Sequence, residues 1–172
     1  IGPEEYQQFA RGQFQEIVGR IYQIYERRLK MASALDFDNL LTKTIELLRM
    51  HTDVREYFQE MFQYVLIDEY QDTNHAQYVL TKLLMQPQNN LFVVGDASQA
   101  IYGWRGADYR NMLNLKLDFA GMEEYRLEQN YRSTPCILQA ASGVIQNNQS
   151  HPVLELWTEN DDFDKITLME CH

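Results

Sequence analysis

The sequence contains few of the residues that mark several classes of protein. Its 172 residues include only two cysteines, Cys136 and Cys171, which cannot form the framework of a disulfide-stapled domain. Few cysteines favour a reducing compartment, so a cytoplasmic location is expected. Eight glycines and four prolines exclude collagen and low-complexity chains. No apolar run approaches the roughly 18 residues of a membrane span, so we expect a globular protein with no membrane partner.

Positive charge is also scarce. Lysine and arginine number 15 against 25 aspartates and glutamates, which gives a formal net charge of −10. A protein that holds nucleic acid mainly by neutralising phosphates needs a basic surface, because counterion release supplies most of that affinity. Any contact with nucleic acid must therefore depend on a few placed arginine and aromatic side chains, or on other parts of a larger protein.

Apolar residues recur every three or four positions in the first third of the chain, which predicts amphipathic helices. One long helix is expected over residues 14–29 and a second over 40–48. Asp36 or Asp38 is placed to cap the second helix. A third, short helix is expected around 54–62.

The middle of the chain predicts a parallel βαβ unit. Residues 64–67 and 91–94 are short apolar segments, typical of strands buried on both faces of a parallel sheet. A helix over 75–85 separates them. Because ligands bind at the carboxyl ends of strands in open α/β sheets, the residues after 67 and 94 are the first candidates for a site.

The last third predicts a strand-helix-strand series. A helix is expected over 109–119 and a strand over 124–127. A further helix over 137–145 follows Ser133 or Thr134 as its cap. Strand fragments are expected at 153–157 and 166–169.

Acidic side chains follow both predicted strands. Asp68 and Glu69 come directly after the first, and Asp96 follows the second. Paired carboxylates at such a point suit Mg²⁺-nucleotide chemistry, since Mg²⁺ takes a few carboxylate oxygens and a neighbouring carboxylate can activate water. Taken alone, an acidic pair is more often only the polar end of a buried strand.

Three longer strings change that interpretation. They are VLIDEYQDTN (65–74), LFVVGDASQAIYGWRGAD (91–108) and LEQNYRST (127–134). In this order they resemble motifs II, III and IV of the UvrD/Rep-like superfamily 1 DNA helicases, which are ATP-driven translocases on single strands. ALDFDNLL (34–41) resembles the DFDDLL segment upstream of motif II. The resemblance runs from about Phe14 to the end of the chain.

The resemblance implies an α/β fold: a RecA-like parallel sheet flanked by helices, with the start of a second RecA-like domain. Residues 1–32 would be the helical tail of an inserted subdomain. Residues 33–125 would be the later part of the first motor domain, and 126–172 the opening of the second. ATP and Mg²⁺ are the implied cofactors, and DNA repair is among the processes that such helicases serve.

Residue roles follow from the resemblance for the nucleotide site. Asp68 would hold the Mg²⁺ of Mg-ATP, and Glu69 would be the general base toward the attacking water. Gln71, with Asp72, would belong to the network around metal and nucleotide, and Asp96 would support it. Gln99 would sense the γ-phosphate and link the ATP site to the DNA track.

The second motor domain would contribute two groups from motif IV. Tyr131 resembles the ring that stacks on the adenine, and Arg132 the guanidinium that reaches the γ-phosphate. A planar, permanently charged fork suits the charge that develops in phosphoryl transfer. Asn130 can cap or brace that loop. In isolation, the residues would equally suit a capping loop in which Arg132 pairs locally.

Tyr102, Trp104 and Arg105 lie in a glycine-flanked loop, where aromatic residues are poorly placed for a core. They are suited to stack unpaired bases, a contact worth about 1–3 kcal/mol per base. Arg105 can meet a phosphate or pair with a carboxylate such as Asp108. The resemblance to these helicases implies single-stranded DNA and duplex junctions as partners.

The sequence departs from the family pattern in two respects. Ser98 and Ala100 replace the aspartate and serine usual in motif III. No glycine is followed by lysine, so the phosphate-binding G-x-x-x-x-G-K-[ST] loop is absent. We therefore expect an internal fragment that on its own neither hydrolyses ATP nor unwinds DNA.

Several functions stay open beside a 3′–5′ helicase. A helicase-nuclease subunit of the recombination type would share these motifs. A non-catalytic module could use Tyr102 and Trp104 to hold single strands. A metal-dependent phosphohydrolase could be built on Asp68, Glu69 and Asp96, although the histidines show no ligand spacing.

Overall fold

Packing divides the chain into two compact units. The first unit is Ile1–Gln63 with Ala76–Asn90, and the second is Tyr64–His75 with Leu91–His172. The structure is a computed structural model that describes residues 2–161 and 165–170, so Cys171 lies outside the described residues. These two units are defined only by which residues of this chain contact one another, so they do not test the expected motor-domain boundaries. The expected domain boundaries after residues 32 and 125 stay predictions.

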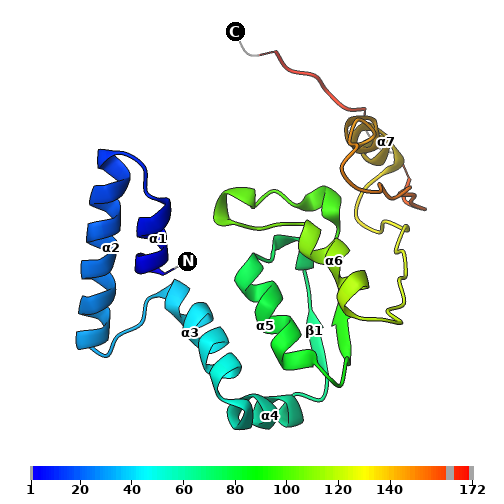
Figure 1. The fold of residues 1–172 in the computed structure, drawn as a ribbon. Coiled ribbons are helices and arrows are strands. Elements are labelled where there is room, and N and C mark those ends of the chain that lie inside the picture. The colour runs from blue at the N-terminus through cyan, green and yellow to red at the C-terminus, as the bar shows by residue number, and fades with distance from the viewer. Residues whose placement is uncertain (1, 162–164, 171–172) are drawn as a thin grey trace. The chain divides into compact units, whose positions relative to one another are not determined.

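The first unit begins with a helical hairpin, α1 (Pro3–Phe9) and α2 (Gln13–Met31) (Figure 1). The rings of Tyr6 and Tyr22 meet edge to face, with centroids 6.2 Å apart. Gly12 has φ = 82°, a left-handed value that favours glycine, and it separates the two helices. The predicted long helix over 14–29 is thus confirmed as α2, whereas the helix before it was not predicted from the sequence.

A side-chain cap fixes the start of α3 (Phe37–Met50). Asp36 Oδ1 accepts a hydrogen bond from the Asn39 backbone N–H at 2.7 Å, and its Oδ2 accepts one from the Tyr25 hydroxyl at 2.8 Å. Of the two caps considered, Asp36 is therefore the one used. The α4 helix (Thr52–Met61) packs against α3. In the same unit, Gln59 donates from Nε2 to the Leu83 carbonyl, in α5 (His75–Met85), at 2.7 Å.

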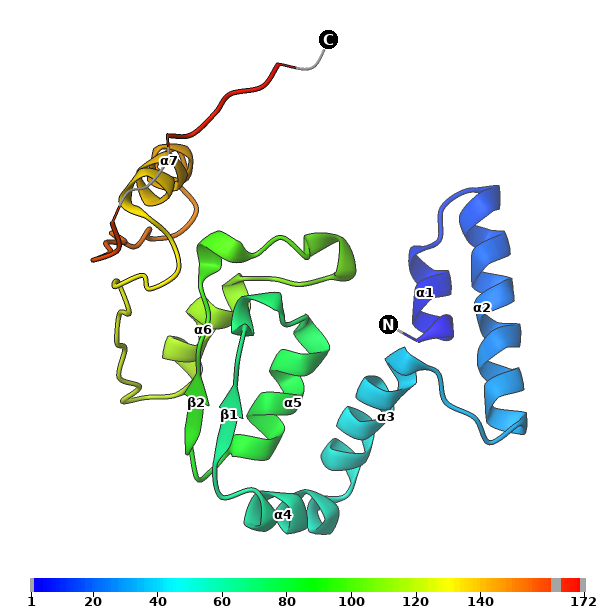
Figure 2. The ribbon, with the colours of Figure 1, turned by 180° about the vertical axis from the view of Figure 1, so that it is seen from behind.

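The described sheet is one parallel pair, β1 (Val65–Ile67) and β2 (Leu91–Val93), with Leu66 opposite Phe92 (Figure 2). The prediction of strands buried on both faces was wrong. Leu66 is 72% exposed and Phe92 is 59% exposed, while their neighbours along each strand are half-buried. Alternate side chains point to opposite faces of a sheet, so one face of this pair is open within the described chain.

The second unit continues with α6 (Arg110–Asp118) and α7 (Pro135–Ile145). The strand predicted over 124–127 is absent, since the described chain offers that segment no partner strand and Tyr125 and Leu127 are exposed. No strand forms at 153–157 or 166–169 either. One isolated parallel bridge, Gln129 with Trp157, is the only pairing found there among the described residues.

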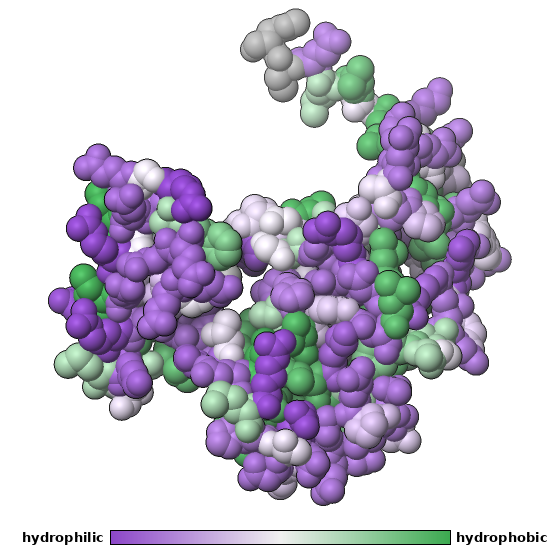
Figure 3. All heavy atoms as spheres, viewed as in Figure 1, coloured by the Kyte–Doolittle hydropathy of each residue, from purple (hydrophilic) through white to green (hydrophobic). Residues whose placement is uncertain are grey.

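Hydrophilic side chains dominate the face drawn in Figure 3, in keeping with the high content of acidic residues. Among the described helices, none has the length and apolar character that crossing a bilayer requires.

Candidate nucleotide and nucleic-acid site

The acidic pair lies where β1 leaves the sheet. Pairing with the other strand continues past β1, because the Val94 N–H donates to the Ile67 carbonyl and the Tyr70 N–H donates to the Val94 carbonyl, each at 2.9 Å. A short 3₁₀ helix, Tyr70–Asp72, follows at once. The turn between them is therefore held to the end of β2, and it presents Asp68 and Glu69 to solvent.

Glu69 occupies a left-handed backbone conformation, with φ = 51° and ψ = 43°. Residues other than glycine, asparagine and aspartate seldom adopt this conformation, and such strain costs of the order of 1 kcal/mol. The Glu69 N–H donates to Asp68 Oδ1 at 2.9 Å, which helps to hold the turn. Nothing in the sequence predicted this conformation.

A series of side-chain hydrogen bonds, which we call the Glu69–Gln99 series, joins the ends of the two strands. Gln71 donates from Nε2 to Glu69 Oε2 at 2.7 Å, and its Oε1 accepts the Asp96 N–H at 3.0 Å. Gln99 donates from Nε2 to Asp96 Oδ2 at 3.0 Å. Gln71 is only 1% exposed, so its bonds are shielded from water. Four predicted site residues are thus brought together.

Gly95 makes this arrangement possible and was not singled out from the sequence. A Cβ atom on Gly95 would lie 2.6 Å from Gln71 Oε1 and 3.2 Å from the Tyr70 N–H nitrogen. Only glycine therefore lets the backbone pass this close to Gln71. The available signal was a glycine directly after an apolar strand, where close backbone approach is common.

Asp72, which was expected in the same network, and Ser98, which departs from the family pattern, both lie near this series. Asp72 Oδ1 is buried and makes no hydrogen bond among the described residues, so it is not joined to the Glu69–Gln99 series. Ser98 donates its backbone N–H to Asp96 Oδ1 at 2.9 Å. Because that bond uses the backbone, the family's usual aspartate is not needed at position 98 to make it.

The carboxylates suit a metal that is bound together with a nucleotide better than one held by protein side chains alone. Among the described residues, no group of three or more histidine, cysteine, aspartate or glutamate side chains can hold a metal ion. Mg²⁺ bound with a nucleotide takes most of its oxygen ligands from phosphates and water and needs only one or two carboxylates. Asp68 and Glu69 fit that case, whereas a phosphohydrolase metal cluster that includes Asp96 is not formed.

The aromatic loop follows three residues after Gln99. Trp104 is 74% exposed and Tyr102 is 39% exposed, so neither ring is buried under the loop. The Arg105 guanidinium carbon lies 4.5 Å from the centroid of the Trp104 ring and 5.5 Å from that of Tyr102. Such cation–π contacts are worth about 0.5–1 kcal/mol at exposed sites. The three residues form one exposed cluster.

Asp108 pairs with Arg110, and Arg105 makes no ion pair among the described residues. Arg110 donates from Nε to both Asp108 oxygens, at 2.8 and 2.9 Å, and from Nη2 to Oδ2 at 2.7 Å. This contact holds the pKa of Asp108 below its usual range. Of the two partners considered for Arg105, the carboxylate is therefore already occupied.

The motif IV loop is held by hydrogen bonds between the Asn130 side chain and backbone N–H groups. Asn130 Oδ1 accepts the N–H groups of Arg132 at 2.9 Å and of Ser133 at 2.7 Å, so Asn130 braces the loop. Thr134 precedes α7 but makes no side-chain cap. Tyr131 and Arg132 are exposed, and no described contact joins either of them to the Glu69–Gln99 series.

The family model of the UvrD/REP helicase N-terminal domain matches residues 1–120, well over half of the chain. The chain belongs to the UvrD/REP helicase family. That match spans the acidic pair, the Glu69–Gln99 series and the aromatic loop, and it ends before the motif IV loop.

Curated relatives carry the resemblance further. The chain is 47% identical over 167 residues to the ATP-dependent DNA helicase PcrA of Leuconostoc citreum, covering 97% of this chain and 22% of that protein. It is 47% identical over 165 residues to PcrA of Bacillus subtilis, covering 96% and 22%. The same identity holds over 169 residues for PcrA of Staphylococcus aureus, covering 98% and 23%. The chain thus spans about a fifth of the length of these relatives.

Proposed function

We propose that the chain is part of the motor of an ATP-dependent DNA helicase that moves 3′ to 5′ on single-stranded DNA and unwinds duplexes. The observation that carries this proposal is the Glu69–Gln99 series, which connects a candidate nucleotide site to a loop of exposed aromatic residues. Its support from relatives is that proteins 47% identical to the chain are named ATP-dependent DNA helicases.

On the nucleotide side, Asp68 would hold the Mg²⁺ that accompanies ATP, and Glu69 would accept a proton from the attacking water. Bound Mg²⁺ would supply charge neutralisation at the phosphates. The hydrogen bond from Gln71 fixes the Glu69 carboxylate in one orientation. A general base must lie within hydrogen-bond reach of the proton it takes, so this orientation matters more than the acidity of the group.

Gln99 would couple the two sites. Its side chain is hydrogen-bonded to Asp96, and its backbone leads within three residues to Tyr102. If Gln99 turns toward a γ-phosphate, it must leave Asp96, which removes one bond that ties the residues before the aromatic loop to the end of β2. Such a change between two hydrogen-bonded arrangements is a physical means of linking ATP turnover to movement on DNA.

On the DNA side, Tyr102 and Trp104 would stack on successive bases, and Arg105 would contribute a cation. Stacking needs no basic surface, which reconciles DNA binding with a net charge of −10. Tyr131 and Arg132 would complete the nucleotide site from the second motor domain. They lie beyond the segment 121–128, which contains no helix or strand and so allows the loop to change position.

The proposal is tested with two activities of the 172-residue chain. A Trp157→Phe background leaves Trp104 as the only tryptophan, and single-stranded oligonucleotide should quench its emission. We expect no turnover of Mg-ATP. Without a phosphate-binding loop, this sequence would leave most of the charge of a bound triphosphate without partners. Absence of quenching would contradict the DNA-binding role, and turnover abolished by Glu69→Gln would contradict the inactivity of the isolated chain.

A second function, a non-catalytic single-strand-binding module, is favoured by the exposure of Trp104. The Glu69→Gln substitution in the longer protein separates the two functions. A motor loses ATP turnover and unwinding with this change but keeps DNA binding, whereas a binding module has no turnover to lose.

A further inference from the structure

A hollow lies beside the aromatic loop and has no role in the proposed function. Its volume is about 550 Å³, and it is lined by seven residues: Ala100, Gly103, Gly106, Ala107, Asp108, Tyr109 and Arg110. Four of the seven have the smallest side chains available. A Cβ atom on Gly103 would meet nothing within 4 Å, so the space beside that residue is open.

The hollow adjoins the residues proposed to bind DNA. Gly103 and Gly106 flank Trp104 and Arg105 in the chain, and they also line the hollow. A strand with one base on Trp104 therefore brings the adjacent nucleotide to this space, because successive nucleotides lie within a few ångströms of one another along a strand. The small side chains leave room for a planar base.

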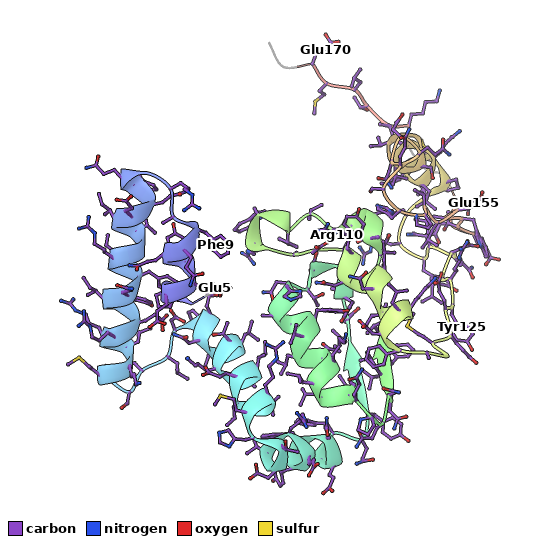
Figure 4. All side chains as sticks on the ribbon, viewed as in Figure 1. Glu5, Phe9, Arg110, Tyr125, Glu155 and Glu170 are labelled. Atoms are coloured by element: carbon purple, nitrogen blue, oxygen red, sulfur yellow. The ribbon has the colours of Figure 1, made fainter. Side chains whose placement is uncertain are left out.

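Of the described residues that line the hollow, Arg110, labelled in Figure 4 at the start of α6, alone has a permanent positive charge. Its guanidinium is fixed by Asp108, which accepts from Nε and Nη2 and also from the Arg110 backbone N–H at 3.0 Å. Asp108 is itself anchored, since its N–H donates to the Thr73 carbonyl at 3.0 Å. The fork thus faces Asp108 on one edge, while the Arg110 side chain is 71% exposed and accessible to a ligand.

One edge of that fork is unused. No described residue accepts a hydrogen bond from Arg110 Nη1, and Nη2 has a second hydrogen to donate. A planar edge of this kind matches two adjacent acceptors, either N7 and O6 of guanine or two oxygens of a phosphate. An arginine side chain is permanently charged, and the hydrogen bonds to Asp108 raise the pKa of Arg110 further.

We propose that this hollow is a nucleotide subsite next to Trp104, in which the free edge of Arg110 donates to a pair of acceptor atoms on the neighbouring nucleotide of the single strand. This inference rests on the proposed DNA-binding function and adds Arg110 as a binding residue. Asp108 acts as a positioning residue for Arg110. The sequence pattern did not single out Arg110, and a D-x-R spacing at a helix start was the available signal.

The test compares Arg110→Gln with a matched control, Arg126→Gln, in the 172-residue chain. Both arginines are exposed and pair with a carboxylate, Arg126 with Glu124 at 3.8 Å, so each change removes one charge and one ion pair. Binding of fluorescein-labelled oligonucleotides is measured by anisotropy over a range of salt concentrations. The probes are oligothymidylate and oligothymidylate with one guanine or one 7-deazaguanine, which lacks the N7 acceptor.

Either of two results would support the subsite, and they distinguish a phosphate acceptor from the edge of a base. If Arg110 binds phosphate, Arg110→Gln lowers the slope of log K against log salt by about 0.7 on oligothymidylate, and Arg126→Gln does not. If it binds the base edge, the wild type prefers guanine over 7-deazaguanine by roughly fivefold or more, and Arg110→Gln removes that preference. Arg110→Lys should keep the salt slope but lose the preference.

The subsite is overturned if Arg110→Gln and Arg126→Gln behave alike on all three probes while Trp104→Ala weakens binding. That outcome leaves the proposed function intact. If the wild-type chain binds none of the probes, the subsite and the proposed function fail together.

Discussion

The two candidate halves of the nucleotide site are built in different ways. The Glu69–Gln99 series is held by side-chain hydrogen bonds around Gln71, which is almost fully buried. The motif IV loop is braced by the Asn130 side chain and by a bond from Asn160 Nδ2 to the Ser133 carbonyl at 3.2 Å, and its functional candidates, Tyr131 and Arg132, are exposed. The candidates of the first half are hydrogen-bonded to one another, whereas no described contact joins Tyr131 or Arg132 to that series.

The largest contrast is expected from the same substitution made beside the Glu69–Gln99 series, at Gly95, and in α7, the helix after the motif IV loop, at Gly143. Gly95→Ala places a methyl group 2.6 Å from Gln71 Oε1, and overpacking of this kind costs about 1–3 kcal/mol. Gly143→Ala in α7 meets nothing within 4 Å and replaces glycine inside a helix, so it should stabilise by about 0.5–1 kcal/mol. Urea denaturation of both variants measures the difference. Equal effects would show that Gly95 is not packed as described.

Gln71→Leu tests the buried centre of the series without changing its volume greatly. The substitution leaves the Asp96 N–H and the Glu69 carboxylate without their shared partner, which costs about 1–3 kcal/mol in the free energy of unfolding. Asp96→Asn is a milder change, since its one oxygen can still accept one of the two bonds that Asp96 accepts, from the Ser98 N–H and from Gln99. A Gln71→Leu chain as stable as the wild type would contradict the shielding of these bonds.

Asn130→Ala should have a smaller effect, about 1 kcal/mol, although it removes two hydrogen bonds. The loop is accessible, so water can satisfy the N–H groups that Asn130 leaves. Arg132→Gln should change stability by no more than about 0.5 kcal/mol, as for other exposed residues. Thermal unfolding checks both values, and a large loss from Arg132→Gln would reveal a contact that fixes this side chain in the folded chain.

The smallest of these effects on stability is expected from acid, through the loss of charge on Asp108 beside the hollow. The pKa of Asp108 is lowered, first by hydrogen bonds from the Arg110 side chain, so folding favours its charged form. That stabilisation is complete above the unfolded pKa of about 3.9 and is lost as the pH falls through the folded value. Asp108→Asn should therefore flatten the pH dependence of the unfolding midpoint below pH about 4. An unchanged profile would show that the pair does not contribute.

Helices were predictable from the sequence where an apolar face repeated over several turns. The α2 and α3 helices were found this way, and Asp36 was one of two caps proposed. The strands were found but not their surroundings, because the apolar run that contains Leu66 does not reveal what covers it. The strand expected over 124–127 failed because an extended segment needs a partner strand.

Sequence grouped the candidate residues of the site but did not predict the bonds between them. The family motifs grouped Glu69, Gln71, Asp96 and Gln99, and the structure joins all four by hydrogen bonds. The left-handed conformation of Glu69 could not be read from sequence, since most residues of its type avoid it. The choice of Arg110 over Arg105 as the partner of Asp108 depends on the turn that starts α6, which sequence spacing alone leaves open.

The most direct test of the link between Glu69 and Gln99 is the ¹⁵N–¹H spectrum of the glutamine side chains in the 172-residue chain. Glu69→Gln changes the acceptor at one end of the series, and Glu155→Gln, on an exposed residue labelled in Figure 4, is the matched control. We predict that Glu69→Gln shifts the side-chain amide resonances of both Gln71 and Gln99 and that Glu155→Gln shifts neither. A Gln99 resonance that stays in place when Gln71 moves would contradict a continuous connection between the two strand ends.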